Sequence, residues 1–205
     1  MSIEFIYFDL GKVLLDFDHW QGCQQMADLA GISAEQVWQV LFESGLQNQY
    51  EAGEISRQQF YDLFCEQTGT QVDDHAIERA GCDIFSVKSE VLPIIVSLAV
   101  NGYRLGLLSN TSTSHWKHCR KQFSIFENLF ETIVLSFEVR AMKPSATIYK
   151  AAVDRAGVPA GSILFIDDLM ENVTGARQAG LEAVQFTGAL PLATELRSRE
   201  VRLGV

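Results

Sequence analysis

Five short apolar runs constrain the fold of this 205-residue chain more than any other feature. They occupy residues 3–8, 104–109, 132–136, 163–166 and 182–186, and turn residues flank each of them. Unbroken apolar runs of this length are typical of strands that are buried on both faces of a parallel sheet. Parallel strands need crossover helices between them, so the pattern predicts an α/β fold with a Rossmann-like parallel sheet core.

Helical periodicity supports this interpretation in the second half of the chain. Gly157 and Gly180 stand where two of the predicted helices end, and a helix C-terminus favours a residue that tolerates positive φ. We expect helices over the following stretches, the last of them a short surface helix in a charged tail: Trp116–Phe123, Thr147–Ala156, Val173–Ala179 and Leu192–Val205.

The segment between the first two runs follows a different pattern. From Asp16 to about Val91 strand-like runs vanish, and apolar residues recur at helical spacing. Ser33 and Ser56 each precede such a stretch and are good N-cap residues. We therefore predict a helical domain over residues 16–91, inserted into a core that comprises residues 1–15 and 92–205.

Composition excludes several partners and compartments. The formal net charge of −10 opposes binding to nucleic acid or to anionic membranes. No apolar stretch approaches the ~20 residues that span a bilayer. The four cysteines form no C-x-x-C pair and no secretory signal is evident, so we expect reduced thiols in a cytoplasmic protein. A monomer and a homodimer are both compatible with the sequence.

Polar side chains follow three of the predicted strands directly. Asp9 ends the first strand, Ser109 the second, and the pair Asp167-Asp168 the fourth. Because the carboxyl ends of parallel strands meet at one edge of an open sheet, these residues should converge there. A carboxylate can act as a nucleophile, and paired carboxylates provide the hard oxygen ligands that Mg²⁺ prefers.

The order of these residues resembles the haloacid dehalogenase (HAD) superfamily. Its four motifs are D-x-D-x-[TV], a strand-end Ser or Thr, a Lys, and a strand-end acidic pair. All are present except the second aspartate of the first motif, whose place Gly11 takes. The matching segments are Asp9-Leu10-Gly11-Lys12-Val13, Leu107-Leu108-Ser109-Asn110, Lys143-Pro144, and Ile163 to Asp168 followed by Asn172.

The resemblance implies a role for each matching residue. Asp9 would be the nucleophile that forms an aspartyl-phosphate, and Lys143 would hold negative charge beside it. Ser109, together with the backbone N–H of Asn110, would bind a phosphoryl oxygen. Mg²⁺ would be bound by Asp9, the Gly11 carbonyl and Asp168, with Asp167 and Asn172 supporting that loop. The inserted helices would form a C1-type cap.

Gly11 removes the acid that would protonate the leaving group, a form of help worth typically ~10²–10⁴-fold in rate. The chain looks most like the D-L-G branch, which includes α-D-glucose-1-phosphatase-like proteins, and the segment from Tyr50 to Ser56 also resembles that branch. The predicted function is a Mg²⁺-dependent phosphomonoester hydrolase acting on a small phosphorylated metabolite. A sugar 1-phosphate would suit, because its leaving oxygen is less basic than an ordinary alkoxide.

The cap would select the substrate. Candidate specificity residues are His19, Trp20, Glu43 and Tyr50, with Asp16 and Asp18 near the same mouth. Two alternatives stay open. A catalytically degenerate HAD protein would bind a phosphorylated ligand or a partner without turnover, which Gly11 favours. A 2-haloacid dehalogenase also lacks the second aspartate, but the Asp167-Asp168 pair counts against it.

Overall fold

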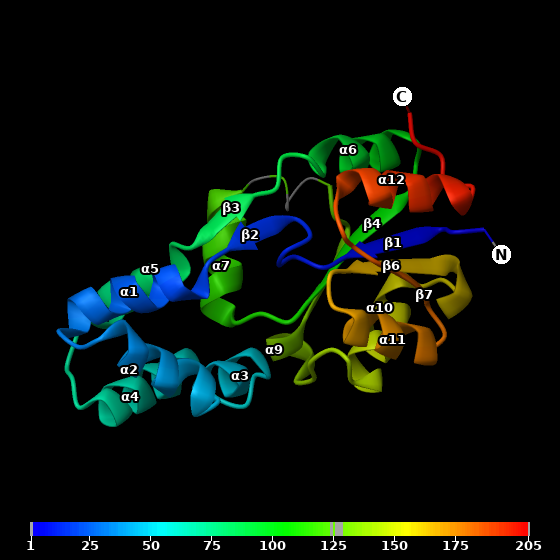
Figure 1. Ribbon diagram of the computed structural model, residues 1–205. Helices are drawn as coiled ribbons and strands as arrows, with labels where there is room; N and C mark the ends of the chain where they lie inside the picture. Colours follow the sequence, from blue (N-terminus) through cyan, green and yellow to red (C-terminus); the bar gives the residue numbers. More distant parts are fainter. Residues whose placement is uncertain (1, 124, 126–128, 205) are drawn as a thin grey trace.

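The computed structural model describes residues 2–123, 125 and 129–204. Its centre is a five-stranded parallel sheet with the strand order β5-β4-β1-β6-β7, which confirms the predicted Rossmann-like α/β core (Figure 1). Each predicted apolar run coincides with one strand to within two residues at either end: β1 (Phe5–Phe8), β4 (Arg104–Ser109), β5 (Thr132–Leu135), β6 (Ile163–Asp167) and β7 (Glu182–Gln185).

The first strand shows why these runs are continuously apolar. Successive side chains of a strand point to opposite faces of the sheet, and both faces are covered here. Ile6 and Phe8 belong to one apolar cluster, whereas Phe5 and Tyr7 belong to another on the opposite face. Helices α6 (Leu92–Val100), α7 (Thr113–Gln122) and α12 (Ala189–Ser198) contribute to the first cluster; α10 (Ala146–Ala156) and α11 (Met170–Gln178) contribute to the second (Figure 1).

Helix ends agree with the predictions to within a few residues. Gly157 follows α10 with a φ of 67°, and Gly180 lies two residues past α11 with a φ of 90°. Helix α7 begins at Thr113, three residues before the predicted start, because the Ser112 side chain accepts a hydrogen bond from the His115 N–H. The tail helix occupies Ala189–Ser198 rather than starting at Leu192, and Val205 lies outside the described residues.

The inserted segment forms a helical layer beside the sheet (Figure 1). It has an apolar cluster of its own, built around Cys23, Met26, Val37 and Phe64. Ser33 and Ser56 cap their helices as predicted, each within a capping box. The elements are α1 (His19–Ala30), α2 (Ala34–Trp38), the π-helix η1 (Gln39–Glu43), α3 (Leu46–Glu51), α4 (Arg57–Thr68) and α5 (Asp74–Cys82). The proposed domain boundaries at residues 16 and 91 stay a prediction.

One expectation for this segment was wrong, because it contains strand structure. β2 (Leu15–Phe17) and β3 (Phe85–Val87) pair as an antiparallel ribbon at the two ends of the insertion. Three-residue strands are too short to show a period in the sequence, and their pairing joins residues far apart in the chain. The ribbon connects the sheet to the helical cap (Figure 1). Two short helices complete the described chain, α9 (Ser136–Val139) and the 3₁₀ turn η2 (Ala160–Ser162).

Among the described residues, no helix has the length and apolar character needed to cross a membrane.

Candidate active site

Asp9 lies directly after β1 at the carboxyl edge of the sheet. Its N–H donates to the Ile166 carbonyl at 2.8 Å, which extends the β1–β6 pairing by one residue. The residue is 8% exposed, and its Oδ1 accepts the Leu10 N–H at 2.7 Å. Oδ2 accepts no hydrogen bond from the described residues, so this oxygen is free to react or to bind a cation.

Lys143 is buried between two carboxylates. Its Nζ lies 2.8 Å from Asp9 Oδ1 and 2.6 Å from Asp167 Oδ2. Burial alone would lower the pKa of Lys143, but the two adjacent carboxylates raise it, so the ammonium stays charged. Burial raises the pKa of Asp9 to about 7; the Asp167 charge acts in the same direction and Lys143 opposes both. The Lys143 ammonium group is therefore the shared ion-pair partner of the Asp9 and Asp167 carboxylates.

Asp167 is the last residue of β6 and is fully buried. Its Oδ1 accepts the Leu169 N–H at 2.8 Å, and Asn172 Nδ2 lies 3.0 Å from Oδ1 and 3.1 Å from Oδ2. Oδ2 also accepts the Lys143 ammonium. With both oxygens engaged, Asp167 is arranged to hold Lys143 and the loop that leads into α11.

Asp168, by contrast, is half-buried and has no ion pair within the described part of the chain. Burial and the neighbouring Asp167 charge raise its pKa, and the charges of Lys143 and Lys12 oppose this only in part. Carboxylate oxygens of Asp9, Asp167 and Asp168 lie within 4.8 Å of one another. Three carboxylates with a single lysine leave excess negative charge at this edge of the sheet.

This donor set fits a hard divalent cation. Its ligand atoms are oxygens, as Mg²⁺ and Ca²⁺ require. The Gly11 carbonyl accepts no backbone N–H among the described residues, whereas the neighbouring Leu10 carbonyl accepts those of Leu14 and Leu15. Asn172 Oδ1 is buried beside the acidic group and accepts no hydrogen bond from the described residues. A buried polar atom without a protein partner is usually satisfied by a water molecule or an ion.

The Asn110 side chain has a role in addition to the one predicted for its backbone N–H. Its side chain accepts the Lys143 backbone N–H at 2.8 Å and donates to the Lys143 carbonyl at 3.0 Å, so it fixes the lysine from both sides. Phosphate binding by its backbone N–H stays a prediction. Ser109 is 2% exposed and ends β4, beside the strand that ends at Asp9.

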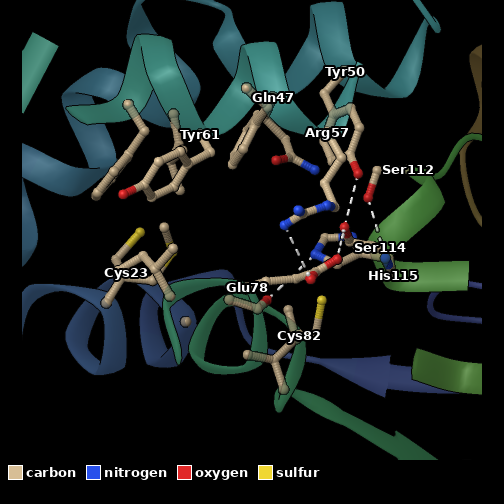
Figure 2. Close-up of a pocket in the computed structure, with 18 of the residues that line it drawn as sticks. Cys23, Gln47, Tyr50, Arg57, Tyr61, Glu78, Cys82, Ser112, Ser114 and His115 are labelled. Carbon is tan, nitrogen blue, oxygen red and sulfur yellow. Dashed lines mark hydrogen bonds and ion pairs between the residues drawn. The ribbon is translucent and has the colours of Figure 1, made fainter. Parts of the chain in front are cut away.

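A cavity of about 60 Å³ lies between the cap and the start of α7 (Figure 2). Most of its wall is apolar, contributed by α1, α3, α4 and α5. Its polar side chains form a connected group: Arg57 pairs with Asp74 and Glu78, Glu78 accepts from Ser114, and Ser114 lies 2.8 Å from the Tyr50 hydroxyl. The lining does not include Asp9 or Lys143, so the cavity is separate from the carboxylates.

The structure brings two of the predicted specificity residues to this cavity and leaves two away from it. Tyr50 and His19 line it, and the His19 ring packs 4.7 Å from Phe17. Trp20 is 38% exposed and Glu43 is exposed, and neither belongs to the lining. Glu51 is not among the site residues predicted from the sequence, although it lies within the segment from Tyr50 to Ser56. Its orientation depends on contacts between the cap and the core, which the sequence does not show.

Comparison with known proteins agrees with this geometry. A family model described as haloacid dehalogenase-like hydrolase matches residues 3–180. Fold, strand-end carboxylates and buried lysine all conform to that match, and the chain belongs to the haloacid dehalogenase-like hydrolase family. The family resemblance predicted from the sequence is thus confirmed, while membership of the D-L-G branch stays a prediction.

Three relatives illustrate the range of this family. The D-ribitol-5-phosphate phosphatase of Bacteroides thetaiotaomicron is 25% identical over 190 residues, which cover 89% of this chain and 91% of that protein. A HAD family enzyme of the same organism, crystallised with magnesium and inorganic phosphate, is 27% identical with a TM-score of 0.81, covering 91% of this chain and 96% of that one. The (S)-2-haloacid dehalogenase of Pseudomonas putida is 22% identical over 191 residues, 87% of this chain and 82% of that protein.

Proposed function

We propose that this protein is a Mg²⁺-dependent phosphomonoesterase that forms an aspartyl-phosphate at Asp9 on a small phosphorylated metabolite. The observation that carries the proposal is the Lys143 ammonium shared by Asp9 and Asp167, with Asp168 free beside them. A relative named as a D-ribitol-5-phosphate phosphatase and a neighbour that holds magnesium with phosphate support it.

Asp9 is the proposed nucleophile because one of its oxygens is free. Lys143 and Leu10 hold Oδ1, so the carboxylate cannot rotate away, and Oδ2 is left to attack phosphorus. The P–O bond to the leaving group breaks as the Oδ2–P bond forms, and water then cleaves the aspartyl-phosphate. Lys143 stabilises the charge on the transferred group in a site that is already desolvated.

Asp9, the Gly11 carbonyl and Asp168 are the residues that would hold Mg²⁺. When bound, the cation would offset the repulsion between substrate phosphate and the carboxylates. Asp167 is not proposed as a ligand because four hydrogen-bond contacts occupy its two oxygens. The Ser109 hydroxyl and the Asn110 N–H are proposed to bind a phosphoryl oxygen.

A sugar 1-phosphate is the proposed substrate class. Gly11, at the place of the second aspartate, supplies no acid for a basic leaving group. A substrate whose leaving oxygen is weakly basic needs less protonation, and the hemiacetal oxygen of a sugar 1-phosphate meets that condition.

The test is phosphate release with Mg²⁺ and with EDTA, for the wild-type protein and for Asp9→Asn. The substrates are glucose 1-phosphate, glucose 6-phosphate, ribitol 5-phosphate and p-nitrophenyl phosphate. We expect Mg²⁺-dependent release that the substitution reduces by more than about 10³-fold, as for loss of a catalytic nucleophile. A preference for glucose 1-phosphate over glucose 6-phosphate would support the sugar 1-phosphate proposal.

Two outcomes would favour the alternatives. Chloride release from 2-chloropropionate, insensitive to EDTA, would identify a dehalogenase, the activity for which the Pseudomonas putida relative is named. Binding of Mg²⁺ and phosphate without turnover of any ester would identify a non-catalytic binding protein.

A further inference from the structure

The reaction proposed for Asp9 also needs a residue that donates and accepts a proton. An alkoxide leaving group departs slowly unless an acid protonates it, and water attacks the aspartyl-phosphate slowly unless a base accepts its proton. Gly11 carries no side chain to do either. The inference that follows rests on the proposed phosphatase function, and it concerns which group moves this proton.

Glu51 ends helix α3 and turns its carboxyl group inward. Oε1 accepts the side-chain N–H of Gln47 at 2.8 Å, and Gln47 is only 6% exposed and lines the cap cavity. Burial raises the pKa of Glu51, and the Lys143 charge lowers it in part, so the active-site ammonium acts on this carboxyl through space. Glu51 thus lies near enough to Lys143 to be affected by its charge, and it contacts Gln47, which lines the cavity of the cap.

Three contacts fix the backbone around Glu51 against the core. Ser136 Oγ, at the start of α9, donates to the Glu51 carbonyl at 2.6 Å. The Tyr50 hydroxyl lies 2.8 Å from Ser114 Oγ, on α7. Gly53 is packed so tightly that a Cβ there would stand 2.4 Å from the Phe137 carbonyl oxygen. The backbone at Glu51 is therefore held at the junction of cap and core, next to the loops that follow β4 and β5.

Two other acids near the junction are held in ion pairs. Asp16 is exposed and pairs with Lys12 at 2.5 Å. Glu78 faces Arg57 and accepts the Ser114 hydroxyl. Glu43 is exposed to solvent. Glu51 differs from Asp16 and Glu78 because its side-chain hydrogen-bond partner is a neutral amide, so it can gain and lose a proton without breaking an ion pair.

We propose that Glu51 is the general acid and base of this enzyme, in place of the aspartate that Gly11 replaces. As the Oδ2–P bond forms at Asp9, the P–O bond to the leaving group breaks and the Glu51 proton moves to that oxygen, so the leaving group departs as an alcohol. Water then attacks phosphorus, its proton returns to Glu51, and the Asp9–P bond breaks to release phosphate. Burial raises the pKa of Glu51, which favours the protonated form that the first step needs.

The test compares leaving groups in Glu51→Gln. The glutamine is isosteric and still accepts from Gln47, but it cannot donate an acidic proton. For alkyl phosphates we expect kcat/KM to fall by roughly 10²–10⁴-fold. For p-nitrophenyl phosphate, whose leaving group needs no proton, we expect the rate of aspartyl-phosphate formation to fall by less than about tenfold. The aspartyl-phosphate should then accumulate, because its hydrolysis still needs a base.

Two further variants serve as controls. Glu51→Asp should restore part of the activity on alkyl phosphates, and Glu54→Gln, at an exposed position, should keep wild-type rates.

Equal losses on alkyl and aryl esters would instead make Glu51 a structural residue, and unchanged alkyl rates would overturn the proposal. A second measurement needs no variant: in the wild-type protein, kcat/KM should depend only weakly on the pKa of the leaving group. A steep dependence would overturn the proposal even if Glu51→Gln failed to fold. Absence of turnover by the wild-type protein on every ester would refute the phosphatase function itself, which distinguishes the two failures.

Discussion

The ring of Phe17 lies against Gly11, so closely that a Cβ on Gly11 would stand 2.8 Å from Phe17 Cε1. The ring is held in turn by Lys12, whose ammonium lies 4.5 Å from its centroid, and by the rings of His19 and Phe85. The space that a side chain at Gly11 would take is therefore filled by an aromatic ring. Glycine at position 11, in place of the second aspartate, is therefore required by the packing of Phe17 in this loop.

Gly11→Asp is accordingly expected to cost stability without restoring an acid in its usual place. Overpacking of this kind lowers the free energy of unfolding by about 1–3 kcal/mol. Phe17→Ala should relieve the clash, so the double variant should be less destabilised than the two single costs predict. Urea denaturation of the four proteins measures this, and single costs that add to within about 0.5 kcal/mol would show that the two sites are independent.

Lys143→Met should leave the carboxylates of Asp9 and Asp167 buried without a counter-charge. We expect a loss of about 3–5 kcal/mol of stability in EDTA, as for other broken buried ion pairs. Added Mg²⁺ should then raise the melting temperature of the variant more than that of the wild-type protein, because the cation supplies the missing positive charge. Lys150→Met, at an exposed pair with Asp154, is the control. Equal Mg²⁺ shifts in all three proteins would place the cation elsewhere.

Asp168→Asn should affect the metal-free and the Mg²⁺-bound protein in opposite directions. Burial and the Asp167 charge raise the pKa of Asp168, so its ionised form is disfavoured at neutral pH when no cation is present. The amide should therefore stabilise the protein in EDTA, while the Mg²⁺ concentration that gives half-maximal phosphate release rises by at least roughly tenfold. Thermal melting and a Mg²⁺ titration of the rate check both effects. An unchanged midpoint would show that Asp168 is not a ligand.

His115 should make the folded protein less stable in acid. Burial, together with the charges of His19 and His118, lowers its pKa from 6.5 to about 4, while contact with the Gly81 carbonyl acts in the opposite direction. The unfolded chain binds a proton at higher pH than the folded protein does. Stability is therefore complete above pH 6.5 and falls as the pH drops from there toward about 4, by roughly 3 kcal/mol.

Urea denaturation between pH 7 and pH 4 measures this dependence. His115→Gln should flatten the slope, whereas His75→Gln, at an exposed position, should keep it. A slope that persists in His115→Gln would assign the effect to other groups.

The sheet and the strand-end residues could be predicted because the signals are local. Unbroken apolar runs mark each strand, and Asp9 and Asp167 follow theirs directly. Features that depend on contacts between distant segments could not be predicted. The position of Glu51 depends on its contact with Ser136 and on the packing of the cap. The Asn110 side chain contacts Lys143, which lies 33 residues away in the sequence, only in the folded protein. Nothing in the residues next to Glu51 distinguishes it from a solvent-facing acid at a helix end.

The central position of β1 has a consequence for synthesis. The strand that precedes Asp9 is made before both of its partners, because β4 and β6 begin only at Arg104 and Ile163. Until those segments leave the ribosome, four apolar residues of β1 have no sheet to join. The cap, whose apolar cluster is made of residues between Cys23 and Ala80, can assemble in the meantime. The nascent chain therefore carries an unpaired apolar strand through much of translation, which is the interval in which a chaperone would bind it.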